Sequence, residues 1–130
     1  MQKRNLFAQL YLFGSRDEAG VRGQLETVFG CTFDPQWAKS DAYGRVTWFS
    51  GAFGFEIVFQ AMSRRDDGTW YVVTVGTESK LMDLDAPMEN IDFHVAQMLR
   101  AGGFDQVVDL EEYRSHHLPA GARADRRITA

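Results

Sequence analysis

Three histidines and one cysteine are the side chains that could bind a metal or act in acid–base chemistry. His94 lies mid-helix beside an apolar stripe, and we interpret it as a surface or core-edge residue. His116 and His117 are adjacent, so their side chains point in different directions, and no matching cysteine or carboxylate motif accompanies them. Cys31 follows a predicted helix end, whose dipole raises a thiol pKa. The sequence therefore predicts no metal site and no activated nucleophile.

Paired carboxylates are the other groups that could do acid–base work. Asp66 and Asp67 fall in a predicted turn, and Glu111 and Glu112 lie near the C-terminus, so we interpret both pairs as solvated. Glu56 interrupts an apolar strand and faces either solvent or a cleft. Neither a GxGxxG motif after the first strand nor a GxxxxGK[ST] motif is present. We therefore predict that the chain is not an enzyme and binds no cofactor.

The charge distribution is more informative than the net charge of −4. The segment 119–130 carries a net charge of +2, which leaves −6 for residues 1–118. Within 83–112, Arg100 is the single base and the net charge is −7. The acids there are Asp83, Asp85, Glu89, Asp92, Asp105, Asp109, Glu111 and Glu112. Such a field repels nucleic acid and attracts basic partners, although the solvated face of a helix also carries acids.

The first half of the chain predicts a strand followed by a helix. Residues 6–13 are apolar on nearly both faces, which suits a central strand covered on both sides. Ser15 and Glu18 have the spacing of a capping box, so we expect a helix from Ser15 that ends at Gly30. Its apolar stripe is Val21, Leu25, Val28 and Phe29.

The middle of the chain predicts paired strands. Residues 31–33 favour a short strand, Asp34-Pro35 a turn, and 37–40 a strand or a loop. Residues 45–50 and 53–60 favour strands on either side of a turn or bulge marked by Gly51 and Gly54. A hairpin closed at residues 66–68 leads into a return strand over 69–77.

The last third predicts a second helix that is capped by Asp85 and has Pro87 in its first turn. Gly102-Gly103 ends this helix. Its apolar positions are Met88, Ile91, Val95, Met98 and Leu99. Residues 104–108 favour a short edge strand, and a last helical turn starts at Asp109 and Glu112.

The predicted order is β-α-β-β-β-β-α-(β/α), in a single domain over residues 1–118 with a flexible C-terminal tail at 119–130. We predict an α+β fold in which a mainly antiparallel sheet packs against two principal helices on one face. One cysteine permits no intramolecular disulfide, and neither a signal peptide nor a membrane span is evident. We therefore expect a cytoplasmic protein that contacts no membrane.

This pattern of size, charge and element order resembles the small immunity proteins of bacterial polymorphic-toxin and contact-dependent growth inhibition systems. The stretch Gly103-Phe-Asp-Gln-Val-Val-Asp-Leu-Glu-Glu-Tyr113 looks like the acidic C-terminal ends of such proteins. The resemblance implies a compact cytosolic α+β protein that binds a cognate toxin domain and blocks it.

The charge pattern leads to the same hypothesis from physical grounds. Nuclease toxins need basic clefts to hold phosphates, and an inhibitor can fill such a cleft with carboxylates, with aromatic residues as anchors. The predicted partner-binding residues are Asp83, Asp85, Glu89, Asp92, Asp109, Glu111, Glu112 and Tyr113. Two alternatives stay open: a small-molecule-binding or enzymatic domain with a pocket lined by Glu56 and His94, and a homodimeric adaptor or structural subunit.

Overall fold

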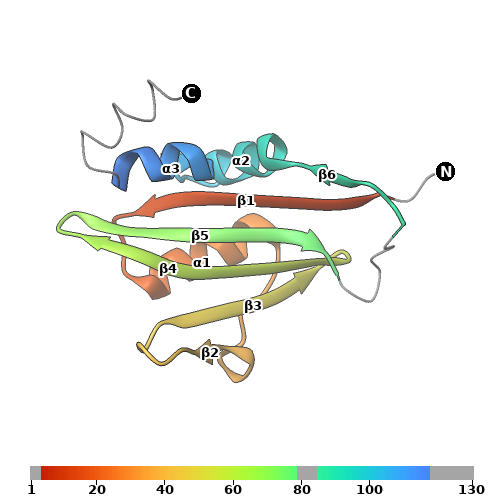
Figure 1. Cartoon of the computed structure of the whole chain (residues 1–130). Coiled ribbons are helices and arrows are strands. Elements are labelled where there is room, and N and C mark those ends of the chain that lie inside the picture. The colour runs from red at the N-terminus through yellow and green to blue at the C-terminus, as the bar shows by residue number, and fades with distance from the viewer. Residues whose placement is uncertain (1–3, 79–84, 118–130) are drawn as a thin grey trace.

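The computed structural model describes residues 4–78 and 85–117, except for the side chains of 116 and 117 (Figure 1). The strands are β1 (Asn5–Gly14), β2 (Lys39–Ser40), β3 (Val46–Ala52), β4 (Phe55–Arg65), β5 (Gly68–Thr77), β6 (Met88–Asn90) and β7 (Gln106–Val108). The helices are α1 (Glu18–Phe29), α2 (Asp92–Ala101) and α3 (Leu110–His117), and Pro35–Trp37 forms a 3₁₀ turn. The α+β class is confirmed, whereas the predicted tail at 119–130 lies outside the described residues.

The strands described form one sheet, in which β1 is an interior strand one position from an edge. The order is β2-β3-β4-β5-β1-β6, and β7 also pairs with β1. One edge of β1 pairs antiparallel with β5 along most of its length. The other edge pairs in parallel with β6 at Asn5–Phe7 and antiparallel with β7 at Tyr11–Phe13. The predicted, mainly antiparallel sheet is therefore confirmed. β1 is paired along both edges, but it lies near one end of the sheet, and Phe7 and Gln9 on its second face are exposed.

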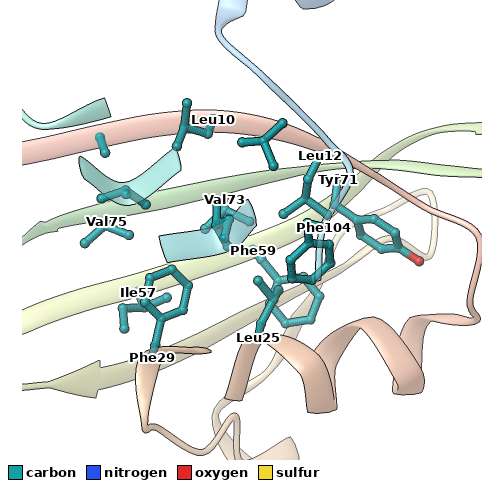
Figure 2. Packing of buried hydrophobic residues seen from close by; sticks show 14 of the residues in the cluster. Leu10, Leu12, Leu25, Phe29, Ile57, Phe59, Tyr71, Val73, Val75 and Phe104 are labelled. Carbon is teal, nitrogen blue, oxygen red and sulfur yellow. The ribbon is translucent and has the colours of Figure 1, made fainter. Parts of the chain in front are cut away.

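The hydrophobic core lies between one face of this sheet and helices α1 and α2. Alternate residues of β1, such as Leu10 and Leu12, point to this face because side chains alternate along a strand. Leu25 and Phe29 of α1 pack against the strands from below (Figure 2). The buried members of the cluster also include Val95, Ala96 and Leu99 of α2. These two helices are the principal helices that the apolar stripes predicted.

The third helix, predicted only as a last helical turn, packs on the face opposite the two principal helices. Tyr113 of α3 stacks on Tyr11, with ring centroids 4.2 Å apart. It also meets Trp70 edge-on at 5.5 Å. Because Tyr11 and Trp70 alternate with core residues, this contact covers part of the second face.

The start of α1 differs from the predicted capping box, while its end is confirmed. Asp17, and not Ser15, caps the helix, because its Oδ1 accepts a hydrogen bond from the Gly20 amide at 2.8 Å. Glu18 instead accepts a hydrogen bond from Trp48 Nε1 at 2.8 Å, which joins the helix to β3. Gly30 has φ of 64°, the left-handed conformation expected of a helix C-cap.

The hairpin predicted at residues 66–68 is present, and the turn or bulge predicted at Gly51 and Gly54 is a second hairpin. Each turn contains two residues. Asp66 and Asp67 link β4 to β5, with Arg65 paired to Gly68. Phe53 and Gly54 link β3 to β4, with Ala52 paired to Phe55. Among residues 31–40, only Lys39 and Ser40 are a strand, so the short strand expected at 31–33 is wrong.

The predicted start of the second helix is also wrong. Residues 88–90 form β6, and α2 begins at Asp92, where the Asn90 side chain accepts a hydrogen bond from the Asp92 amide at 2.8 Å. Met88 and Met98, expected in the core, are exposed. The end of α2 at Gly102 and the last helix, with Asp109 accepting from the Glu112 amide at 2.8 Å, are as predicted.

Candidate functional site

The predicted acidic residues that the structure describes lie on β6, α2 and α3 and in the short segments before β6 and α3. Asp83 lies outside the described residues, and Asp85 is exposed ahead of β6. Glu89 of β6 forms an exposed ion pair with Arg4 at 2.9 Å, which is worth at most about 1 kcal/mol. Its side chain points to the face opposite that of Asn90, because the two are adjacent in a strand.

Three of the predicted carboxylates line one groove between the β1–β6 edge and α3. The groove has a volume of about 450 Å³. Asp92 enters from the start of α2, and its Oδ1 accepts a hydrogen bond from the Gln9 amide at 2.9 Å. Asp109 and Glu111 enter from the start of α3. The full lining is Phe7, Gln9, Asn90, Asp92, Asp109, Leu110, Glu111 and Arg114. We call this the acidic groove.

The acidic groove brings together Asp92 and Asp109, which are 17 positions apart along the chain. Asp92 and Asp109 each begin a helix, where a carboxylate is stabilised by the helix dipole. Each also keeps a second oxygen that can accept from a partner. Glu112 is exposed on α3 and does not line the groove.

Tyr113, predicted as an aromatic anchor for a partner, is half-buried against the sheet. Its ring is stacked on Tyr11, and its hydroxyl lies 3.2 Å from Ser63 Oγ. These contacts hold α3 on the sheet, and so they position Asp109 and Glu111 at its start.

The sheet face beside the acidic groove is the open face, made of two rows of cross-strand neighbours. The first row is Phe7, Gly76, Glu56 and Gly51, and the second is Gln9, Thr74, Val58 and Phe49. Gln9 and Thr74 are exposed, whereas Val58 and Phe49 are half-buried. Phe7 belongs both to the open face and to the acidic groove, so the two surfaces are continuous.

Glu56 lies on the open face of the sheet and lines a groove there, so of the two predicted environments it occupies a cleft. Its neighbours in both adjacent strands are glycines, Gly51 and Gly76, so no side chain flanks it within its row. It lines a second groove, of about 480 Å³, at the far side of the open face. The lining there also includes Trp37, Lys39, Phe49 and Glu78, and the Lys39 ammonium lies 5.5 Å from the Phe49 ring.

The charges of these two grooves are unequal. Among the described residues, five carboxylates line the two grooves, against Lys39 and Arg114. At neutral pH the open face is thus bordered by a net negative charge, with apolar side chains between its ends. A surface of this kind attracts a basic partner and offers aromatic and aliphatic contacts once the partner is bound.

His94 and Glu56 do not share a pocket, contrary to what the small-molecule alternative expected. His94 lines an apolar pocket of about 240 Å³ between α2 and the β3–β4 turn. That pocket lies on the core side of the sheet, because Ile57 and Val75 also line it. Glu56 is on the opposite side.

Cys31 is half-buried, and burial together with the charge of Glu26 raises its thiol pKa, against a hydrogen bond with Ser50 that lowers it. The direction agrees with the sequence prediction, although burial is the main cause. In the described part of the chain, no group of three or more His, Cys, Asp and Glu side chains could hold a metal ion.

Phe53, Trp37 and Phe49 are surface aromatics that the site prediction missed. Phe53 lies at the tip of the β3–β4 hairpin with 92% of its surface exposed and φ of 55°. The Phe53-Gly54 pair lacks the Asn-Gly or Asp-Gly signature of such a turn, so Gly51 and Gly54 indicated a turn or bulge here but not its two-residue form.

Comparisons with protein-family models, curated proteins and solved structures find no match to this chain. Among the described helices, none is both long and apolar enough to cross a membrane. The site must therefore be interpreted from its own chemistry.

Proposed function

We propose that this protein is an immunity-type inhibitor that neutralises a basic toxin domain by binding it in a one-to-one complex. The observation that carries the proposal is the set of carboxylates bordering the open face. The open face and the acidic groove would form the contact surface, and neither requires a bound cofactor.

The charge distribution supports association with a basic surface rather than with nucleic acid. Phosphates would be repelled by the five carboxylates, whereas lysine and arginine side chains would be attracted. Asp92, Asp109 and Glu111 could accept hydrogen bonds from guanidinium groups, which pair well with carboxylates. A toxin cleft that holds phosphates has the complementary charge, and filling it would exclude the toxin's substrate.

The shape of the surface supports a protein partner rather than a small molecule. Both grooves lie along the open face, whose rows no described helix covers, and Val58 and Phe49 between them give an apolar centre. A polar rim around an apolar centre is the usual anatomy of a protein interface. Tyr113 contributes indirectly, because its stacking on Tyr11 fixes the helix that carries Glu111.

The direct test is co-purification with the toxin domain encoded by the neighbouring upstream gene, at low salt. We expect a one-to-one complex whose association slows as salt is added. Absence of any complex at low salt would refute the proposal.

The surface is tested by reversing two of its carboxylates, Glu56→Lys and Glu111→Lys, singly and together. We expect each to slow association at low salt by ~10-fold, since charges at an interface rim act mainly on the association rate. Asp66→Lys is the matched control, because it makes the same charge change in the β4–β5 turn. If Asp66→Lys slowed association as much as the other two, net charge and not this surface would govern binding.

A further inference from the structure

The apolar pocket between α2 and the β3–β4 turn is not part of the surface used by the proposed function. Side chains from α1, the sheet and α2 line it, including Ile57, Val75, His94 and Met98. Within the part of the chain that the structure describes, its lining contains no Asp, Glu, Lys or Arg. A basic partner therefore gains nothing there from its charge, whereas an uncharged apolar group would be bound by burial alone.

The pocket is large enough for an aromatic ring. An apolar cavity of roughly 150 Å³ can hold benzene, and this one has a volume of about 240 Å³. Met98 at its rim is 46% exposed, so the pocket is accessible from solvent.

Phe53 supplies a ring of that kind at the rim of the same pocket. It is among the lining residues, yet 92% of its surface is exposed, so its ring is almost entirely outside the pocket of its own chain. Its φ of 55° is a conformation that a bulky residue rarely adopts. Asparagine or glycine would suit this turn better, so the contacts within one chain do not explain a phenylalanine here.

We propose that two copies of the chain form a symmetric dimer in which Phe53 of each copy enters the apolar pocket of the other. A projecting ring beside a matching pocket makes the surface self-complementary, which is what a two-fold contact requires. Each chain then offers one ring and one pocket, and the contact closes at two copies.

The expected dimer is weak. A buried aromatic side chain removes ~150–250 Å² from solvent, so two insertions bury roughly 600–1,000 Å² when both surfaces are counted. Stable specific interfaces bury roughly 1,200–2,000 Å². We therefore expect a dimer that forms with increasing concentration and dissociates on dilution.

The test is sedimentation velocity over a concentration series of the full chain. We expect the wild-type mass to rise from 14.7 kDa towards twice that value. Phe53→Asn removes the ring but suits a left-handed turn, and should weaken dimerisation by ~10-fold or more. Met98→Glu places a carboxylate at the pocket rim and should weaken it similarly from the other side of the contact.

The matched control is Phe93→Asn, which removes an exposed aromatic of α2 that does not line the pocket. This variant should dimerise like the wild type. A wild-type chain that stays monomeric at the highest soluble concentration would overturn the proposal, as would a Phe53→Asn variant that dimerises normally. Neither result would bear on toxin binding, which is tested on the open face.

Discussion

Replacing Phe53 by asparagine should make the monomer more stable, although it removes a large apolar side chain. Phe53 and Gly54 both have positive φ, at 55° and 84°, as a two-residue turn of type I′ requires. A residue with a Cβ loses about 1–2 kcal/mol in this left-handed conformation. Asparagine tolerates it better because its short polar side chain can hydrogen-bond locally.

The magnitude follows from weighing the turn against the lost contact. With 92% of Phe53 exposed, its remaining contact with its own chain is worth roughly 0.4 kcal/mol at about 25 cal/mol per Å². Relief of the turn should recover about 1 kcal/mol or slightly more. The net gain is therefore about 0.5–1 kcal/mol in the free energy of unfolding.

The assay is urea unfolding, at a protein concentration low enough that any dimer has dissociated. Phe53→Ala is the critical comparison, because alanine removes the ring but keeps the Cβ that causes the strain, and should give no gain. Phe53→Gly should lie between the two, since glycine relieves the strain but costs entropy. An asparagine variant less stable than the wild type would show that the ring contributes to folding, and would refute this reasoning.

Three further substitutions or conditions test other parts of the fold. Tyr113→Ala should lower the free energy of unfolding by about 2 kcal/mol in urea titrations, below the ~3–5 kcal/mol of a fully buried aromatic, because Tyr113 is half-buried where it stacks on Tyr11. Gly68→Ala should cost ~1–3 kcal/mol by the same measurement, because an added Cβ would lie 2.4 Å from the Gly14 carbonyl oxygen. Burial raises the pKa of Cys31 above 9.0 in the folded chain, so the folded state keeps this proton longer than the unfolded state. Its contribution to stability is complete below about pH 9 and is lost as pH rises through the folded pKa, so a Cys31→Ser chain should lose less stability in urea titrations above pH 9.

The elements that the sequence predicted well depend on local patterns. The stripe Val21, Leu25 and Phe29 is buried as a helical period requires, and Gly30 ends α1 in the left-handed conformation. The strands of the β4–β5 hairpin show alternation, and Asp67-Gly68 marks their turn. In each case the signal lies within a few residues of the structure that it specifies.

The errors lie where distant contacts outweigh local patterns. Asp85 and Pro87 resemble a helix start, but Met88–Asn90 pairs with Asn5–Phe7 of β1, about 80 positions away. Glu18 has the sequence spacing of a capping box with Ser15, yet its carboxylate accepts a hydrogen bond from Trp48 Nε1 of β3. No pattern within either segment could show those partners.

The candidate site was predictable in its charge but not in its geometry. The sequence showed an acidic segment, yet only the pairing of β6 and β7 with one edge of β1 places Asp92 near Asp109. Tyr113 next to two glutamates suggested an exposed anchor. Its helical position turns it toward Tyr11 instead, and a short segment alone does not show which face of a helix will be covered.

The two proposed contacts can coexist because they use opposite faces of the sheet. Glu56 on the open face and Ile57 in the apolar pocket are adjacent in β4, so their side chains point in opposite directions. The two contacts should differ in their response to salt. Screening weakens an association driven by carboxylates but not one driven by apolar burial. A dimer formed through the pocket would leave both open faces free, and could hold two toxin domains at once. The ratio of toxin to inhibitor would stay at one to one, while the mass of the complex would double with concentration.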